Sequence, residues 1–209
     1  MRVALVDYDS GNLHSAEKAF ALMGRETGAE VVVTSDPEVV ARADRLVLPG
    51  DGAFPACRAA LEAVPGMVEA LREAVLARAV PFMGICVGMQ MLAEIGHEYR
   101  DTAGLGWIGG EIDPIRAPGL KVPHMGWNDL TVLQAHPLLD GISTGDHAYF
   151  VHSWQFRVND LAHLLATADY GGPVTAVVGR DNIAGTQFHP EKSQAVGLRI
   201  IGNFLRWNP

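Results

Sequence analysis

The sequence has few of the features that mark secreted, membrane-bound or nucleic-acid-binding proteins. Its 209 residues include only two cysteines, Cys57 and Cys86, which form no CxxC pair. This argues against a disulfide framework and for a reducing compartment. The 16 Lys and Arg residues are outnumbered by 24 acids, with no basic run, which argues against nucleic-acid binding. The first apolar run is too short for a signal peptide or a membrane span. We therefore expect a cytoplasmic protein that binds neither nucleic acid nor a membrane.

The first half of the chain alternates short apolar runs with helical segments. Strands are predicted over 2–7, 30–34, 45–50 and 80–86, and the clearest helices between them over 15–24 and 68–79. Runs without polar alternation are typical of parallel strands buried on both faces. The pattern predicts an α/β fold with a parallel core and helices on both faces.

From about Trp107 the spacing of the apolar segments shortens, and Gly, Asn, Asp and Pro turns separate them. This favours an antiparallel extension of the same sheet. The segment 193–207 has apolar residues near helical spacing and predicts a closing amphipathic helix. With no repeat or linker, residues 1–209 are expected to form a single domain.

A cysteine bracketed by glycines lies where a predicted strand meets a predicted helix over 87–95. The order Gly84-Ile85-Cys86-Val87-Gly88 is typical of a nucleophile elbow, with Cys in place of Ser. The glycines allow close backbone approach, and a helix N-terminus stabilises a thiolate. The alternative is a buried structural cysteine, which is the usual state of a cysteine and the interpretation we give to Cys57.

A thiolate nucleophile needs a proton carrier, and the segment GTQFHPEKS supplies one. His189 precedes a proline, which biases it to an extended conformation, so His189 and Glu191 should lie on the same side of a strand-like segment. The carboxylate could then orient the imidazole, as in a Cys-His-Glu triad. The alternative is a strand-end histidine beside a surface glutamate.

No spacing of His, Cys and acidic residues resembles a metal site, so we expect none. The segment GLGWIGG, residues 104–110, contains GxGxxG but lacks the strand before and the helix after that a dinucleotide site requires. No cofactor is therefore expected.

Three motifs, LPGDGAF, GICVGMQML and FHPEKS, together resemble the class I, triad-type glutamine amidotransferases. DYDSGNLHS, KVPHMGWN, YFVHSW and QFHPEKSQ narrow the resemblance to the glutaminase subunits of imidazole glycerol phosphate synthases. The resemblance implies a flavodoxin-like fold and glutamine hydrolysis to glutamate and ammonia through a thioester. It also implies a heterodimer with a (β/α)8 cyclase subunit, which uses the ammonia to make imidazole glycerol phosphate and AICAR in histidine biosynthesis.

The resemblance also assigns roles to individual residues. Cys86 would be the nucleophile, His189 the proton carrier and Glu191 its orienting partner, with backbone N–H groups of Val87 and Asp51 holding the oxyanion. Glutamine would be bound by Gly52, Gln90, Ser153 and Trp154, and the cyclase would contact Asn12, Lys121, Trp127, Tyr149 and Lys192. The loop PGDG and Trp154 depart from the family pattern, which has PGVG and often a tyrosine.

Two other functions remain open at this point. The chain could be the glutaminase subunit of a different synthase. More distantly, it could be a non-glutaminase α/β protein with a reactive cysteine elbow, such as a cysteine peptidase or a redox-responsive binding protein.

Overall fold

One mixed sheet of eight strands runs through the computed structural model, which describes residues 1–9 and 13–209. Its order is β2-β1-β3-β4-β14-β13-β12-β9. The first five strands pair in parallel and the last three are antiparallel additions. The strands are β1 (Arg2–Val6), β2 (Glu30–Thr34), β3 (Arg45–Gly50), β4 (Phe82–Cys86), β9 (Thr131–Val132), β12 (Leu164–Asp169), β13 (Pro173–Arg180) and β14 (Ile183–Thr186). This confirms the predicted parallel core with an antiparallel extension.

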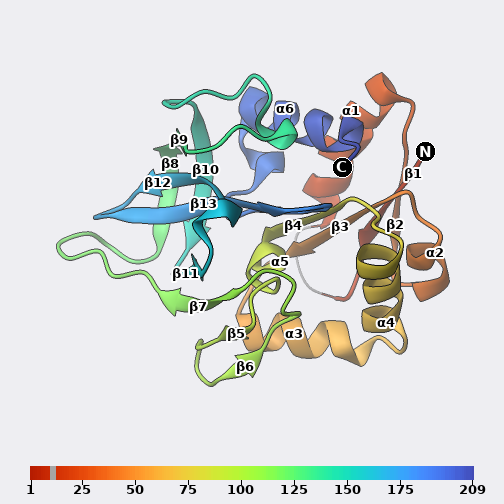
Figure 1. Ribbon diagram of the computed structural model, residues 1–209, viewed down its shortest axis with the longest axis horizontal. Coiled ribbons are helices and arrows are strands. Elements are labelled where there is room, and N and C mark those ends of the chain that lie inside the picture. Colours follow the sequence, from red (N-terminus) through yellow and green to blue (C-terminus); the bar gives the residue numbers. More distant parts are fainter. Residues whose placement is uncertain (10–12) are drawn as a thin grey trace.

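Helices cover both faces of the sheet, as predicted. Figure 1 shows α1 and α6 packed side by side above it and α3 and α4 below it. The central strands β3 and β4 are buried along their whole length, which explains their continuous apolar sequence. The helices are α1 (Leu13–Thr27), α2 (Pro37–Ala41), α3 (Phe54–Ala63), α4 (Met67–Arg72), α5 (Val87–Gln90) and α6 (Gln194–Arg206). A π-helical turn, η1 (Glu73–Ala77), follows α4, and 3₁₀ turns are η2 (Pro137–Leu139), η3 (Leu161–His163) and η4 (Pro190–Lys192).

The helix that follows Cys86 is shorter than predicted. We expected it over 87–95, but α5 ends at Gln90. The backbone N–H of Glu94, which a continuing helix would direct to the Gln90 carbonyl, donates instead to the Gly110 carbonyl, and the Met91 carbonyl accepts from Leu105. Tertiary pairing therefore overrides the local helical pattern.

Two small sheets, formed by segments between residues 95 and 158, were not predicted from the sequence. One is the antiparallel pair β8 (His124–Asp129) and β10 (His147–His152). The other has the order β11-β7-β5-β6, with β5 (Ile95–Gly96), β6 (Thr102–Ala103), β7 (Gly110–Pro114) and β11 (Trp154–Val158). The motif YFVHSW thus spans the end of β10 and the start of β11, with Ser153 between them.

The GxGxxG match lies between two strands. The two-residue strand β6 does precede it, contrary to our expectation, but β7 follows it where a dinucleotide site requires a helix. The match therefore still fails its context test.

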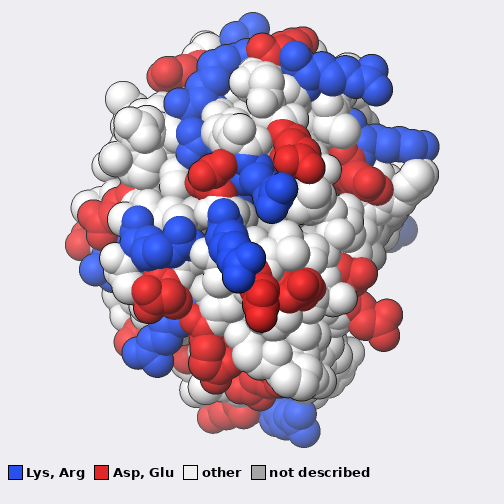
Figure 2. All heavy atoms as spheres, turned by 90° about the vertical axis from the view of Figure 1, so that its right-hand side faces the viewer, with Lys and Arg blue, Asp and Glu red and all other residues white. Residues whose placement is uncertain are grey.

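No helix within residues 1–9 and 13–209 is long and apolar enough to cross a membrane. Figure 2 shows the face that lies on the right of Figure 1, where basic and acidic side chains are interspersed. Neither sign forms a continuous field on this face.

Candidate active site

Cys86 sits on a strained turn between β4 and α5. Its backbone has φ +54° and ψ −111°, a conformation that L residues rarely adopt. The residue is 4% exposed, and its thiol is not part of a disulfide. A strained cysteine at the carboxyl end of a parallel strand fits the predicted nucleophile elbow.

The two glycines around Cys86 allow this turn to form. A Cβ on Gly84 would lie 2.5 Å from the Gly88 carbonyl oxygen, and a Cβ on Gly88 would lie 1.8 Å from that of Leu48. Any larger residue would push α5 away from β3 and β4. The glycine bracket is therefore a packing requirement of the elbow.

His189 and Glu191 form a buried pair. The Nδ1 atom of His189 lies 2.7 Å from Oε1 of Glu191, and both side chains are at most 6% exposed. His189 is extended, as expected before Pro190, but Glu191 lies in the 3₁₀ turn η4 and not in a strand-like segment. Since proline fixes its own φ and starts such turns, the carboxylate curls back to the imidazole. Nδ1–H then donates to Glu191, which leaves Nε2 for the chemistry.

The imidazole is strongly influenced by Cys86. Burial lowers the pKa of His189, but the hydrogen-bonding and charge interactions with Cys86 and Glu191 together outweigh it and raise the pKa to about 10. Nε2 itself is buried and has no aligned hydrogen-bond partner in the described chain. We take the pair to be in electrostatic contact without a well-formed hydrogen bond, an arrangement common in enzymes without substrate.

A pocket of about 250 Å³ opens over Cys86. Its lining includes every oxyanion and substrate residue that the sequence predicted, namely Asp51, Gly52, Val87, Gln90, Ser153 and Trp154. A larger hollow of about 530 Å³ between α1 and α6 contains none of these residues and no triad member. Chemistry, and not volume, therefore identifies the candidate site.

Sequence reasoning missed Glu98, whose carboxylate is a charged group in the pocket lining. Its Oε2 accepts a hydrogen bond of 2.7 Å from the backbone N–H of Phe54, which anchors it at the start of α3. No local motif surrounds Glu98. Only its place after β5, opposite the first turn of α3, brings it to the site.

Gln187 was also missed, although it lies within the quoted motif QFHPEKSQ. Its Nε2 lies 3.7 Å from Sγ of Cys86, and its Oε1 accepts a hydrogen bond of 3.1 Å from Nε2 of Gln90. The residue is fully buried. The parallel pairing of Thr186 with Ile85 places it level with Cys86.

Two buried histidines support the far wall of the pocket. Nδ1 of His124 lies 3.0 Å from Nε2 of His152, and Nδ1 of His152 lies 2.8 Å from the Trp154 carbonyl oxygen. Burial lowers the pKa of each to about 4, so both are neutral at pH 7. Because the Trp154 carbonyl can only accept, it sets the direction of both hydrogen bonds: His152 donates to Trp154, and His124 donates to His152.

The residues predicted to contact a partner lie on a mostly exposed surface. Trp127 is 48% exposed and its ring meets that of Tyr149 at 5.9 Å, edge to face. Lys121 is exposed, Lys192 is half-buried, and Asn12 lies outside the described residues. Exposed apolar side chains on and before β8 extend this surface, and they are Leu120, Val122 and Met125.

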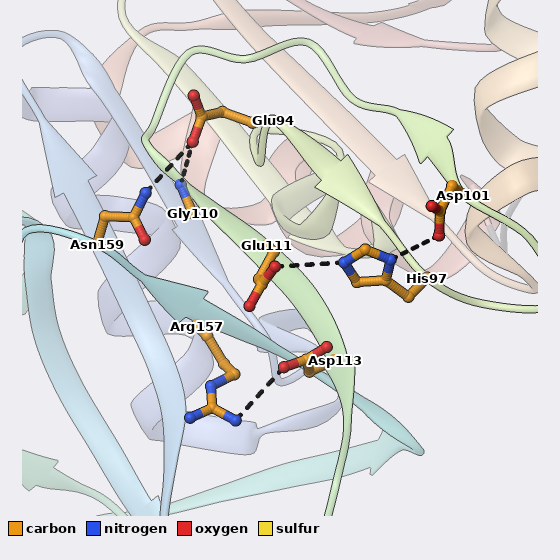
Figure 3. Close-up of polar contacts among 8 residues, drawn as sticks. All are labelled: Glu94, His97, Asp101, Gly110, Glu111, Asp113, Arg157 and Asn159. Atoms are coloured by element: carbon orange, nitrogen blue, oxygen red, sulfur yellow. Dashed lines mark hydrogen bonds and ion pairs between the residues drawn. The ribbon is translucent and has the colours of Figure 1, made fainter.

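One group of metal-type ligands lies away from the pocket, on the small sheet. His97, Glu111 and Asp113 bring their ligand atoms within 4.8 Å of one another. In Figure 3, His97 bridges Asp101 at 2.7 Å and Glu111 at 3.3 Å, and Arg157 pairs with Asp113 at 3.4 Å. Hydrogen bonds to Asp101 and Glu111 raise the pKa of His97. The group acts as an ion-pair network, and the absence of a metal site stays a prediction.

The comparison with protein families assigns the chain to a class. The family described as glutamine amidotransferase class-I matches residues 4–206. The chain belongs to this family, which confirms the predicted enzyme class.

Solved structures show the same fold. A crystal structure of a glutamine amidotransferase aligns with a TM-score of 0.74 at 20% identity, over 97% of each chain. The glutaminase domain of Trypanosoma brucei CTPS with bound acivicin aligns with a TM-score of 0.66 at 14% identity, over 100% of this chain and 95% of that one.

Sequence relatives are more specific. The chain is 65% identical to the imidazole glycerol phosphate synthase subunit HisH of Ruegeria pomeroyi and 60% identical to that of Rhodospirillum rubrum. Each alignment covers 100% of both chains. The predicted resemblance to these subunits is therefore confirmed.

Proposed function

We propose that this chain is the glutaminase subunit of an imidazole glycerol phosphate synthase. It would hydrolyse glutamine to glutamate and ammonia and pass the ammonia to a (β/α)8 cyclase subunit. The observation that carries the proposal is the strained Cys86 beside the buried His189–Glu191 pair, in a pocket lined by the predicted substrate residues. A single domain fits the main core cluster, whose residues run from Val3 to Trp207. Both cysteines are buried and neither forms a disulfide, which suits a reducing cytoplasm.

The pocket offers groups suited to a free amino acid with an amide side chain. The Glu98 carboxylate would pair with the α-ammonium of glutamine. Gln90, in the same pocket lining, would lie near the polar groups of the bound glutamine. A neutral peptide bond within a chain offers no such ammonium. This supports glutamine over a peptide substrate.

The reaction would begin from a Cys86 thiolate whose proton lies on Nε2 of His189, as the raised pKa of His189 favours. The sulfur then attacks the side-chain amide carbon, and the oxyanion that forms accepts hydrogen bonds from the backbone N–H groups of Val87 and Asp51. As the C–N bond breaks, His189 gives its proton to the leaving nitrogen. Ammonia departs and a thioester on Cys86 remains.

Water completes the cycle. His189 accepts a proton from water as its oxygen adds to the thioester carbon, and the same oxyanion groups hold the second tetrahedral intermediate. The C–S bond breaks, glutamate leaves, and Cys86 returns to the thiolate beside the protonated His189. Glu191 keeps Nδ1 protonated throughout and stabilises the imidazolium that forms in each half-reaction.

Ammonia requires a protected route, because bulk water converts it to ammonium, which is not a nucleophile. A partner seated beside Cys86 would provide that route. The surface of Trp127, Tyr149, Lys121 and Lys192 suits this role, because exposed aromatic residues are frequent interface anchors. We propose it as the cyclase interface, with Asn12 included from the sequence.

The nucleophile is tested by Cys86→Ala, with Cys57→Ser as the matched control. The control variant alters the other cysteine but keeps a donor for the Asp51 carbonyl, which the Cys57 thiol contacts at 3.5 Å. In the reconstituted complex, Cys86→Ala should lose glutamate release and keep synthesis from ammonium salt. Comparable glutamine hydrolysis by Cys86→Ala would exclude the proposed mechanism, and a wild-type enzyme that releases no glutamate would exclude the function.

The ammonium contact is tested by Glu98→Gln, which keeps an acceptor for Phe54 but removes the charge. A hydrogen bond to a charged group contributes about 1.5–3 kcal/mol, so KM for glutamine should rise about 10- to 100-fold. Ammonia-driven synthesis should not change. An unchanged KM would remove Glu98 from the binding site.

The interface is tested by Trp127→Ala and Lys192→Ala. Both should weaken the complex or raise the ratio of glutamate to cyclase product, while ammonia-driven synthesis stays near normal. Leu161→Ala and Lys18→Ala are controls, since both residues are exposed and lie on other elements. Unchanged affinity and ratio in both test variants would exclude this surface. Normal glutaminase activity with no cyclase product would favour a different synthase.

A further inference from the structure

Gln187 contacts the reacting sulfur and has no role in the chemistry described above. It follows β14 and is fully buried beside Cys86. Its Nε2 lies 3.7 Å from Sγ of Cys86, within the range of an N–H···S hydrogen bond. The backbone N–H of Gln187 donates to the Ala176 carbonyl at 2.8 Å, which fixes the base of the side chain.

The orientation of the Gln187 amide follows from its neighbours. The Trp154 carbonyl oxygen can only accept, so the Gln90 atom 3.2 Å from it is the amino group. That same nitrogen lies 3.1 Å from the Gln187 amide, whose facing atom must therefore be the oxygen. The other end of the Gln187 amide, which faces the sulfur, is then the amino group. The Trp154 carbonyl thus sets the direction of each hydrogen bond from Gln90 to Gln187 and makes Gln187 a donor to Cys86.

A fixed donor suits a thiolate better than a thiol. Hydrogen bonds to an ionised partner are about twice as strong as those between neutral groups. A thiolate is also the form of cysteine that acts as a nucleophile. The amide is fully buried and is held at its oxygen by Gln90, so it stays aimed at the sulfur.

We propose that Gln187 is a further catalytic residue, which donates a hydrogen bond to the Cys86 thiolate and holds the sulfur ready for attack. With the thiol proton on His189, the Gln187 N–H stabilises the thiolate that remains on Cys86. Gln187 neither gains nor loses a proton. The inference rests on the proposed nucleophilic role of Cys86.

The test is the pH dependence of Cys86 alkylation by iodoacetamide, read by peptide mass spectrometry so that Cys57 is scored separately. Gln187→Met removes the donor at similar side-chain length. Gln134→Met is the matched control, since the Gln134 amide donates two hydrogen bonds of 2.7 Å to the Leu161 and Leu164 carbonyls away from the pocket. The other charged groups near the sulfur, which are His189, Glu191, Asp51 and Glu98, are the same in all variants.

In Gln187→Met, the pH of half-maximal alkylation should rise by roughly one to two units, with a fall in rate of about 10- to 100-fold below that midpoint. Gln134→Met should lose stability without moving the midpoint. If Gln187 served packing alone, Gln187→Met would likewise lose stability while the pH of half-maximal alkylation stayed unchanged. An unchanged alkylation midpoint in Gln187→Met would therefore overturn the proposal.

A second variant keeps the test decisive if Gln187→Met fails to fold. Gln187→Glu keeps an acceptor for Gln90 but turns an acceptor toward the sulfur, so the midpoint should rise at least as far. A midpoint that does not rise in this variant overturns the proposal. If wild-type Cys86 is no more reactive than Cys57 at neutral pH, the proposed nucleophile itself fails, which is distinct from failure of Gln187 alone.

Discussion

Replacement of Gly88 by alanine should damage both the stability and the activity of this protein. The new Cβ would lie 1.8 Å from the Leu48 carbonyl oxygen, whereas real Cβ contacts essentially never fall below 3.0 Å. The obstacle is the backbone of β3, which cannot rotate away as a side chain can. Either α5 or β3 must therefore move by roughly 1 Å or more, and Cys86 adjoins both, since it precedes α5 and pairs with Gly50 of β3.

The size of the effect follows from this clash. Overpacking of a well-packed core costs about 1–3 kcal/mol, and a backbone obstacle belongs at the upper end. We expect Gly88→Ala to lower the free energy of unfolding by about 3 kcal/mol, which lowers Tm by about 6–12 °C in a domain of this size. Displacement of a catalytic group by 1 Å can cost about 100-fold, so kcat for glutamine hydrolysis should fall by a similar factor.

Thermal unfolding and a glutamate-release assay measure the two effects. Gly109→Ala is the control, because a Cβ there would meet nothing nearer than 3.7 Å and its φ is not positive. It should stay within about 0.5 kcal/mol of wild type. If Gly88→Ala changed neither Tm nor kcat more than Gly109→Ala does, close packing of the elbow would not be the reason that position 88 requires glycine.

Two further predictions concern the surroundings of the site. Because burial lowers the pKa of His124 and His152 to about 4, their contribution to stability is complete above pH 6.5 and is lost as the pH falls toward 4. Between pH 6.5 and 4, each histidine should lower the free energy of unfolding by up to about 1.4 kcal/mol for each unit that the pH falls, as measured by denaturant unfolding. A free energy of unfolding that stays constant from pH 6.5 to 4.5 would contradict this. Tyr8→Phe removes the 2.6 Å bond from the buried phenol to the Pro49 carbonyl and should lower kcat several-fold with little change in KM. Thr175→Val is the control, because it removes an equally short buried hydrogen bond to a backbone carbonyl and should lower stability by a similar amount without changing kcat. Equal kcat values in the two variants would exclude a role for Tyr8 in positioning the PGDG loop.

The sequence by itself determined the central sheet and the elbow. Strands buried on both faces must be apolar throughout, so β3 and its parallel neighbours were visible as continuous runs. The predicted bounds 30–34 and 45–50 agree with β2 and β3. Cys86 was visible for a similar reason, because the turn and its close contacts require glycine at positions 84 and 88. The His189–Glu191 pair was found because both residues lie in one short segment.

Only the tertiary structure decided the features that depend on segments far apart in the chain. The helix after Cys86 has a local pattern that favours nine residues, but the Glu94 N–H pairs with the Gly110 carbonyl and the Met91 carbonyl with Leu105, so neither group continues the helix. Glu98 is one acid among 24 until its carboxylate is held by Phe54, 44 residues away. Gln187 reaches Cys86, 101 residues away, because the register of β14 on β4 places it there. Local sequence encodes burial and turn geometry, whereas sheet register and chain return set which distant polar groups meet, and these groups complete the pocket.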